Sequence, residues 1–111
     1  MNFHSQTIDI LANRLLCTHN YALVCPYIKY NIGEIDLFAY RELKYKYFLF
    51  FEVKSKDCPK YRKKARNQLE RHAKTFGSLA NRVFKFYVYP STDKYYTIEW
   101  VKLQNGNNEN I

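Results

Sequence analysis

The sequence predicts a single α/β domain in which helices flank a mixed β-sheet of about five strands. A chain of 111 residues is long enough for one compact core and too short for two. Two segments carry apolar residues at helical spacing, and several others carry the short apolar runs, bounded by turn residues, that indicate strands. Their order is αβββαββ. We assign residues 1–103 to the domain and expect the polar segment 104–111 to be a disordered tail.

The first predicted element is a helix that Ser5 is placed to cap. Asp9 lies about 100° around the helix axis from Ile8, so it stands at the border of the apolar face rather than at the centre of the wet face. The helix is expected to pack on the sheet with this acid at its margin. The apolar face consists of Ile8, Leu11, Ala12, Leu15 and Leu16.

Three strands are predicted next, over residues 21–30, 33–40 and 47–54. The polar segment RELKYK separates the last two, so they can pair as an antiparallel hairpin. The third strand carries the bulky apolar run FLFF and then ends in two charges, Glu52 and Lys54. Ions at the edge of a core are costly unless a metal, an ion partner or catalytic work compensates them. This strand end is therefore a candidate functional site.

A long basic helix is predicted over residues 60–79, followed by strands over 83–89 and 95–101 with the turn PSTDK between them. We interpret His72 as a core histidine with satisfied hydrogen bonds rather than as a ligand or a base. One face of the Tyr-rich last strands is also a candidate dimer interface. The inner face of the helix consists of Ala65, Leu69, His72, Ala73, Phe76 and Ala80.

The composition is basic and aromatic. Lys and Arg number 18 against 10 Asp and Glu, which gives a net charge of +8, and 18% of the residues are aromatic. Such a surface suits a polyanion, because cations neutralise phosphates and rings stack on bases. The alternative is a basic protein whose charge serves solubility alone. The three cysteines form no CxxC pair and leave one over in any disulfide scheme, which favours a reducing compartment.

The sequence carries neither a signal peptide nor an apolar run of membrane-spanning length. We therefore expect a soluble intracellular protein, cytoplasmic or nucleoid-associated, with a viral origin also open. No membrane partner and no organic cofactor are expected.

Four charged side chains converge if the predicted hairpin forms. Glu34 and Asp36 share one face of their strand, and Glu52 and Lys54 share one face of the next. Clustered carboxylates repel one another, which makes them poor structural groups and good ligands for a cation. With hard oxygen donors and no Cys or His at ligand spacing, the ion expected is Mg²⁺ or Mn²⁺. The alternative is a hairpin with cross-strand ion pairs, each contributing little at a surface.

Asp36 and the EVK triplet 52–54 at the end of the next apolar strand resemble the signature of the PD-(D/E)xK nuclease superfamily. The order of the surrounding elements, with a helix before GEIDL and a basic helix after FFEVKSK, is similar to that superfamily's core. Within it, the chain most resembles archaeal Holliday-junction resolvases, in the segments THNYALVC (18–25) and HAKTFGS (72–78). GEIDL and FFEVKSK also resemble a bacterial branch of small predicted nucleases.

The resemblance implies a restriction-endonuclease-like core and a structure-specific, Mg²⁺-dependent endonuclease that hydrolyses DNA phosphodiesters in recombination and repair. Resolving a four-way junction takes two symmetric cuts, so a homodimer on branched DNA is expected. Asp36, Glu52 and the main-chain carbonyl of Val53 would hold the metal. Lys54 would act on the attacking water or on charge developing at the phosphate.

Three further residues are candidates for a supporting role at the site. Asp9 stands where the family's first helix carries a Glu, and Glu34 precedes Asp36 on the same strand. Gln68 lies where many members carry a Gln on the helix after the lysine strand, and it borders the inner helix face. It would touch the attacking water or the scissile phosphate, or it is an exposed polar residue.

DNA binding is expected on the basic side of the long helix, although a solvated face is the usual alternative for such a run. Two other functions stay open. One is a repair or end-processing nuclease on single-stranded or flap DNA, and the other is a non-catalytic nucleic-acid binding module. The candidate DNA-binding residues are Lys56, Lys60, Arg62, Lys63, Lys64 and Arg66.

Overall fold

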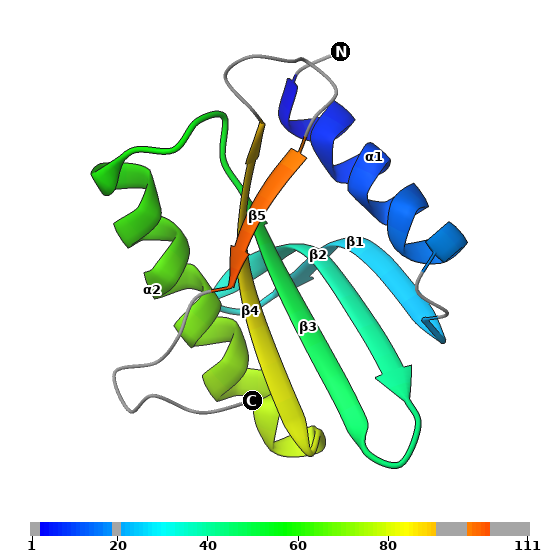
Figure 1. The fold of residues 1–111 in the computed structure, drawn as a ribbon. Helices are drawn as coiled ribbons and strands as arrows, with labels where there is room; N and C mark the ends of the chain where they lie inside the picture. The colour runs from blue at the N-terminus through cyan, green and yellow to red at the C-terminus, as the bar shows by residue number, and fades with distance from the viewer. Residues whose placement is uncertain (1–2, 19–20, 91–97, 103–111) are drawn as a thin grey trace.

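The structure, a computed structural model, describes residues 3–18, 21–90 and 98–102, in which two long helices flank a mixed β-sheet (Figure 1). The α/β class predicted from the sequence is confirmed. The elements in chain order are α1 (Phe3–Thr18), β1 (Leu23–Tyr30), β2 (Gly33–Glu42), β3 (Lys46–Val53), α2 (Pro59–Phe76), the 3₁₀ helix η1 (Gly77–Leu79), β4 (Arg82–Pro90) and β5 (Ile98–Lys102).

The strands lie across the sheet in the order β1-β2-β3-β4-β5. Neighbouring strands are antiparallel, except that β3 and β4 are parallel. A parallel pair needs a long crossover connection, and α2 lies in it. The predicted hairpin of β2 and β3 is present, with Glu42 opposite Lys46 next to its turn.

Each long helix covers one face of the sheet. Ile8, Leu11 and Leu15 of α1 pack in one core with Leu49, Phe51 and Val53 of β3, whereas Phe50 packs in a second core with Ala65 and Leu69 of α2. Successive side chains of β3 thus enter opposite cores, because side chains alternate along a strand. The uninterrupted apolar run of β3 is explained by its position, since both faces of this strand are covered.

Two helix boundaries differ from the prediction. α1 begins at Phe3, so Ser5 lies inside the helix, and the prediction that Ser5 caps it was wrong. The side of α1 that faces the sheet extends back to His4, four residues before Ile8, and this accounts for the start of the helix before Ser5. α2 ends at Phe76, and η1 follows where a continuous helix was expected.

The strand boundaries shift by smaller amounts. β1 begins at Leu23, β2 continues to Glu42 and β3 ends at Val53. Residues 95–97 of the last predicted strand, and the segment 104–111, lie outside the described residues. Among the residues that the structure describes, no helix has both the length and the apolar character needed to cross a membrane.

Candidate active site

The alternation of faces reverses in β2 at Asp36. Ile35 belongs to the core under α2, whereas Leu37 belongs to the core under α1, although residues two apart on a regular strand share a face. The pairing of β1 with β2 skips Asp36 and the opposite residue, Tyr27, whose φ of 57° lies in the left-handed region. This irregularity in both strands directs the Asp36 carboxylate sideways, toward β3.

The Asp36 carboxylate binds the main chain of β3. Its Oδ2 atom accepts a hydrogen bond from the N–H of Val53 at 2.8 Å and lies 3.2 Å from Nε2 of His4 on α1. The N–H of Lys54 points the other way, to the carbonyl of Val88 on β4 at 2.9 Å. Because the N–H and C=O of one strand residue point to the same side, the carbonyl of Val53 also faces the Asp36 side.

Glu52 is the most buried acid of the site, with 1% of its side chain exposed. Its Oε1 atom lies 2.9 Å from Nε2 of His72 on α2, and its Oε2 atom lies 4.0 Å from Nζ of Lys54. Burial, reinforced by the nearby Asp36 carboxylate, raises the pKa of Glu52 to about 9. The Glu52 carboxyl is therefore protonated at neutral pH until a cation compensates its charge.

His72 is buried, and each of its ring nitrogens has a hydrogen-bond partner. Its Nδ1 atom lies 2.6 Å from the hydroxyl of Tyr30, and burial lowers the pKa of His72 to about 4. At neutral pH the contact between His72 and Glu52 is therefore a hydrogen bond between neutral groups rather than an ion pair. The sequence predicted a satisfied core histidine at this position, and the structure adds that the partner is an acid of the candidate site.

Lys54 is held by α2. Its Nζ atom donates a hydrogen bond to Oε1 of Gln68 at 2.9 Å, and 20% of its side chain is exposed. Gln68 and His72 are four residues apart, so they lie on the same side of α2. One helix face thus contacts both ionisable residues at the end of β3, Lys54 through Gln68 and Glu52 through His72.

Two acids predicted at the site lie elsewhere. Glu34 has 40% of its side chain exposed and lies 3.9 Å from Nζ of Lys29 on β1. The Glu34 side chain does not point the same way as that of Asp36, because the alternation of faces along β2 is interrupted at Asp36. Asp9 is exposed on α1, whose inner stripe runs through His4 and Ile8 instead. Within the described ranges, no group of three or more His, Cys, Asp or Glu side chains is placed to hold a metal ion.

The sequence interpretation missed two residues of this cluster, His4 and Tyr30. A signal for His4 existed, because it stands four residues before Ile8 and so extends the apolar stripe of α1. Tyr30 carried no comparable signal: its hydroxyl meets a residue 42 positions away in the sequence.

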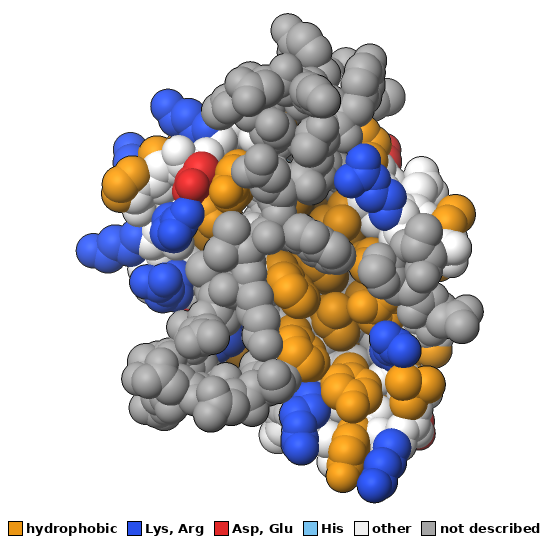
Figure 2. Space-filling view, viewed as in Figure 1, with side chains coloured by type: hydrophobic (Ala, Val, Ile, Leu, Met, Phe, Trp, Pro, Cys, Tyr) orange, Lys and Arg blue, Asp and Glu red, His pale blue; other side chains and the backbone are white. Residues whose placement is uncertain are grey.

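The basic side chains of α2 face solvent. Figure 2 shows Lys and Arg side chains gathered along the side of the molecule that α2 forms. Arg62 differs from its neighbours, because its guanidinium binds both carboxylate oxygens of Asp57, at 2.9 and 3.1 Å, and lies 5.7 Å from the ring centre of Tyr87. The other five candidate DNA-binding residues are exposed, namely Lys56, which precedes α2, and Lys60, Lys63, Lys64 and Arg66.

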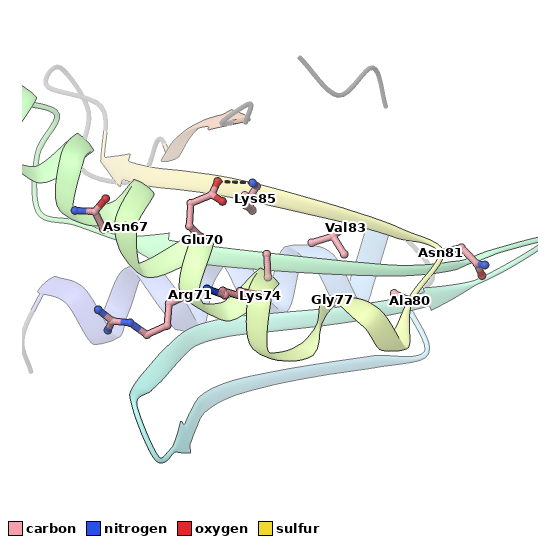
Figure 3. A pocket seen from close by; sticks show the side chains of 10 residues that line it. Asn67, Glu70, Arg71, Lys74, Gly77, Ala80, Asn81, Val83 and Lys85 are labelled. Atoms are coloured by element: carbon pink, nitrogen blue, oxygen red, sulfur yellow. Dashed lines mark hydrogen bonds and ion pairs between the residues drawn. The ribbon is translucent and has the colours of Figure 1, made fainter. Parts of the chain in front are cut away.

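A surface pocket of about 650 Å³ lies between α2 and β4 (Figure 3). The buried Lys85 in its wall is neutralised by Glu70, with 2.6 Å between Nζ and Oε1. Arg71, also in the wall, donates to the carbonyl of Ile32 at 3.1 Å. Among the described residues that line the pocket, Glu70 is the single acid and is already paired, so the pair of Asp36 and Glu52 remains the better candidate for metal-dependent chemistry.

Comparisons of the chain with protein-family models, with curated proteins and with solved structures find no match.

Proposed function

We propose that the protein is a Mg²⁺-dependent endodeoxyribonuclease with a restriction-endonuclease-like core of the PD-(D/E)xK type. One observation carries the proposal: Asp36 and Glu52, two buried carboxyls from adjacent strands, meet beside Lys54, whose ammonium is fixed by Gln68. A buried acid with a perturbed pKa, as Glu52 is, next to a lysine is costly for stability, and such groups concentrate at functional sites.

The donor set fits a small hard cation. Carboxylate oxygens and a main-chain carbonyl are the ligands that Mg²⁺ and Mn²⁺ prefer. Asp36 would contribute Oδ1, since Oδ2 already binds the N–H of Val53, and Glu52 would contribute Oε2 because Oε1 faces His72. The carbonyl of Val53 would complete the protein ligands. Mg²⁺ commonly keeps several waters and takes only one or two carboxylates, so a third acid is not required.

Mg²⁺, when bound, polarises the scissile phosphate and lowers the pKa of a water molecule that it binds. Asp36 and Glu52 would hold the ion in place, and Glu52 would release its proton on loading. The ammonium of Lys54, oriented by Gln68, would stabilise the charge that develops on the phosphate oxygens. The oxygen of water would form a bond to phosphorus and lose a proton to solvent. The ester bond to one sugar oxygen would break and that oxygen would take up a proton from solvent, which leaves a terminal phosphate and a hydroxyl.

The proposed substrate is DNA, most favourably a four-way junction. The net charge of +8 and the exposed cations of α2, which follows β3 in the chain, suit the phosphates of duplex arms. The resemblance of the sequence to archaeal Holliday-junction resolvases favours a branched substrate and a homodimer with one site in each protomer. Single-stranded ends and flaps are the alternative substrates of the same chemistry.

The deciding experiment incubates labelled junction, flap, duplex and single-stranded DNAs with Mg²⁺ and with EDTA. Glu52→Gln protein serves as the matched control, because it keeps the size of the side chain and removes the ionisable group. Junction cutting that is fastest, needs Mg²⁺ and is lost in the control supports the full proposal. Faster cutting of flaps or single strands would support the nuclease proposal and would replace the junction with these DNAs as the proposed substrate.

A second candidate function is a non-catalytic nucleic-acid binding module. It is favoured by the structural bonds that Asp36 makes to Val53 and Glu52 makes to His72, which would let both acids serve as scaffold. Such a module would bind DNA equally well in EDTA and would leave every substrate of the panel intact.

A further inference from the structure

We propose that His72, held by Tyr30, is a positioning residue that orients Glu52 for metal binding. The inference rests on the proposed function, since it assigns a role within the same site. It goes beyond it in adding two residues, from α2 and β1, that touch neither the phosphate nor the metal.

The three side chains form a continuous chain of hydrogen bonds. The hydroxyl of Tyr30 lies 2.6 Å from Nδ1 of His72, and Nε2 of His72 lies 2.9 Å from Oε1 of Glu52. His72 and Glu52 each have 1% of the side chain exposed, so water does not compete for the contact between them.

Aromatic rings fix the plane of the imidazole. The ring of Tyr30 meets His72 edge to face, with 5.6 Å between centroids, and also packs on Phe76 at 5.0 Å. Phe50 lies against the imidazole at 5.9 Å. With its ring held on several sides, His72 directs Nε2 at Glu52 without a search through alternative rotamers.

The direction of the hydrogen bonds follows from the chemistry of a metal ligand. An ionised Glu52 can only accept, so Nε2 of His72 must carry the proton and donate it. The Nδ1 atom is then an acceptor, and the hydroxyl of Tyr30 donates to it. This arrangement occupies Oε1 of Glu52 and leaves Oε2, on the side of Lys54, for the cation. Partners of this kind orient ligands and typically change metal affinity by about 10–100-fold.

Two substitutions separate positioning from simple core filling. The side-chain amide of Gln stands as many bonds from Cβ as Nε2 of His, so His72→Gln keeps a donor for Glu52. The amide of Asn stands at the place of Nδ1, so His72→Asn keeps a partner for Tyr30 and loses Glu52. Both variants are neutral and polar, and both leave part of the space of the imidazole empty.

The experiment measures Mn²⁺ binding to the full chain by electron paramagnetic resonance of the free ion. We expect His72→Asn to weaken Mn²⁺ binding by about 10–100-fold and His72→Gln to retain most of it. Thermal unfolding of the metal-free variants checks that both are folded. Equal losses in the two variants, or no loss in either, would overturn the positioning role.

Tyr30→Phe decides the question if the His72 variants do not fold. It removes one hydroxyl and leaves Glu52 and His72 intact, and we expect Mn²⁺ binding to weaken by about threefold to tenfold, the effect of one hydrogen bond. Unchanged affinity would overturn the proposal. In ¹⁵N NMR spectra of the wild type with Mg²⁺, His72 should carry its proton on Nε2, and a proton on Nδ1 would contradict it.

These outcomes are distinct from failure of the proposed function. A wild type that binds Mn²⁺ and cleaves DNA, with equal affinities in His72→Asn and His72→Gln, overturns the positioning role alone. A wild type that binds no Mn²⁺ overturns both.

Discussion

The carboxylate of Asp36 accepts a hydrogen bond from the main-chain N–H of Val53, with 2.8 Å between oxygen and nitrogen. This bond joins β2 to β3 just beyond Leu37 and Phe51, the last residues at that end of the two strands that pair directly. It places an acid of β2 beside Glu52, the residue before Val53. A structural bond and a candidate metal ligand therefore reside in the same side chain.

Asp36→Asn tests the metal site without removing that structural bond. The amide oxygen of Asn can still accept from Val53, but the negative charge is lost. We expect cleavage to fall by more than about a hundredfold, since ligands matter at least as much as their supporting partners. DNA binding should stay equal or become tighter, because a charge that repels phosphate is gone. Cleavage near the wild-type rate would remove Asp36 from the site.

The stability of the metal-free protein should fall as the pH rises from 7 to 9. The folded-state pKa of Glu52, about 9, is raised above its ordinary value of 4.5, so the folded state binds more protons between these pH values and its stability declines with increasing pH. His72, with its pKa lowered from 6.5 to about 4, opposes this slope only below about pH 6.5.

Urea unfolding in EDTA measures this effect, at most about 1.4 kcal/mol per pH unit for one proton. Glu52→Gln protein is the control and should lose the slope, while other groups titrate as before. In the wild type, Mg²⁺ should reduce the decrease of stability with increasing pH, because the ion favours ionised Glu52. An identical pH dependence in the two proteins would show that Glu52 is ionised in the metal-free fold.

Lys54→Ala should reduce cleavage by about 10²–10³-fold, the usual effect of removing one group that stabilises the transition state. Gln68→Ala should cause a smaller loss, because Lys54 remains but its ammonium is no longer held at 2.9 Å. The double variant should cleave no worse than Lys54→Ala alone, since Gln68 acts through Lys54. Single-turnover rates on bound DNA measure all three, and additive losses would indicate that Gln68 acts independently.

Neutralising the exposed cations of α2 should weaken DNA binding by a similar factor for every sequence. If Lys60, Lys63, Lys64 and Arg66 each neutralise one phosphate, each substitution should reduce the slope of log affinity against log salt by about 0.9. Lys44→Gln is the matched control, because it removes one exposed charge within the connection between β2 and β3, at the other end of β3 from the candidate site. If the control and the α2 variants lower the DNA affinity and its salt dependence equally, the cations of α2 contribute only to the net charge and do not contact phosphates.

Junction resolution should produce paired incisions. On a cruciform plasmid, a dimer with two active sites yields linear DNA directly, whereas independent monomers accumulate nicked circles first. Mixing wild type with an excess of Lys54→Ala protein should form heterodimers that nick and stop, provided that subunits exchange. A protein that is monomeric in solution and on DNA, or that cuts single-stranded ends faster than junctions, contradicts the junction assignment and leaves the nuclease proposal standing.

The periodicity of the sequence determined much of the fold. Short apolar runs indicated the strands, and apolar residues at helical spacing indicated the basic helix. The α/β class and the hairpin of β2 and β3 could therefore be predicted. The alternation of side chains along a strand placed Glu52 and Lys54 on one face, where both now contact α2. These features depend on local spacing, which the sequence contains in full.

Only the tertiary structure decided the membership and the charge states of the candidate site. The reversal of faces at Asp36, opposite a tyrosine with positive φ, separates Glu34 from the cluster, and the spacing of the acids alone does not predict it. His4 and His72 reach the two acids from residues 32 and 20 positions away in the chain. Such contacts arise from the packing of helices on a sheet, and the burial that raises the pKa of Glu52 exists only once the sheet and α2 have packed together.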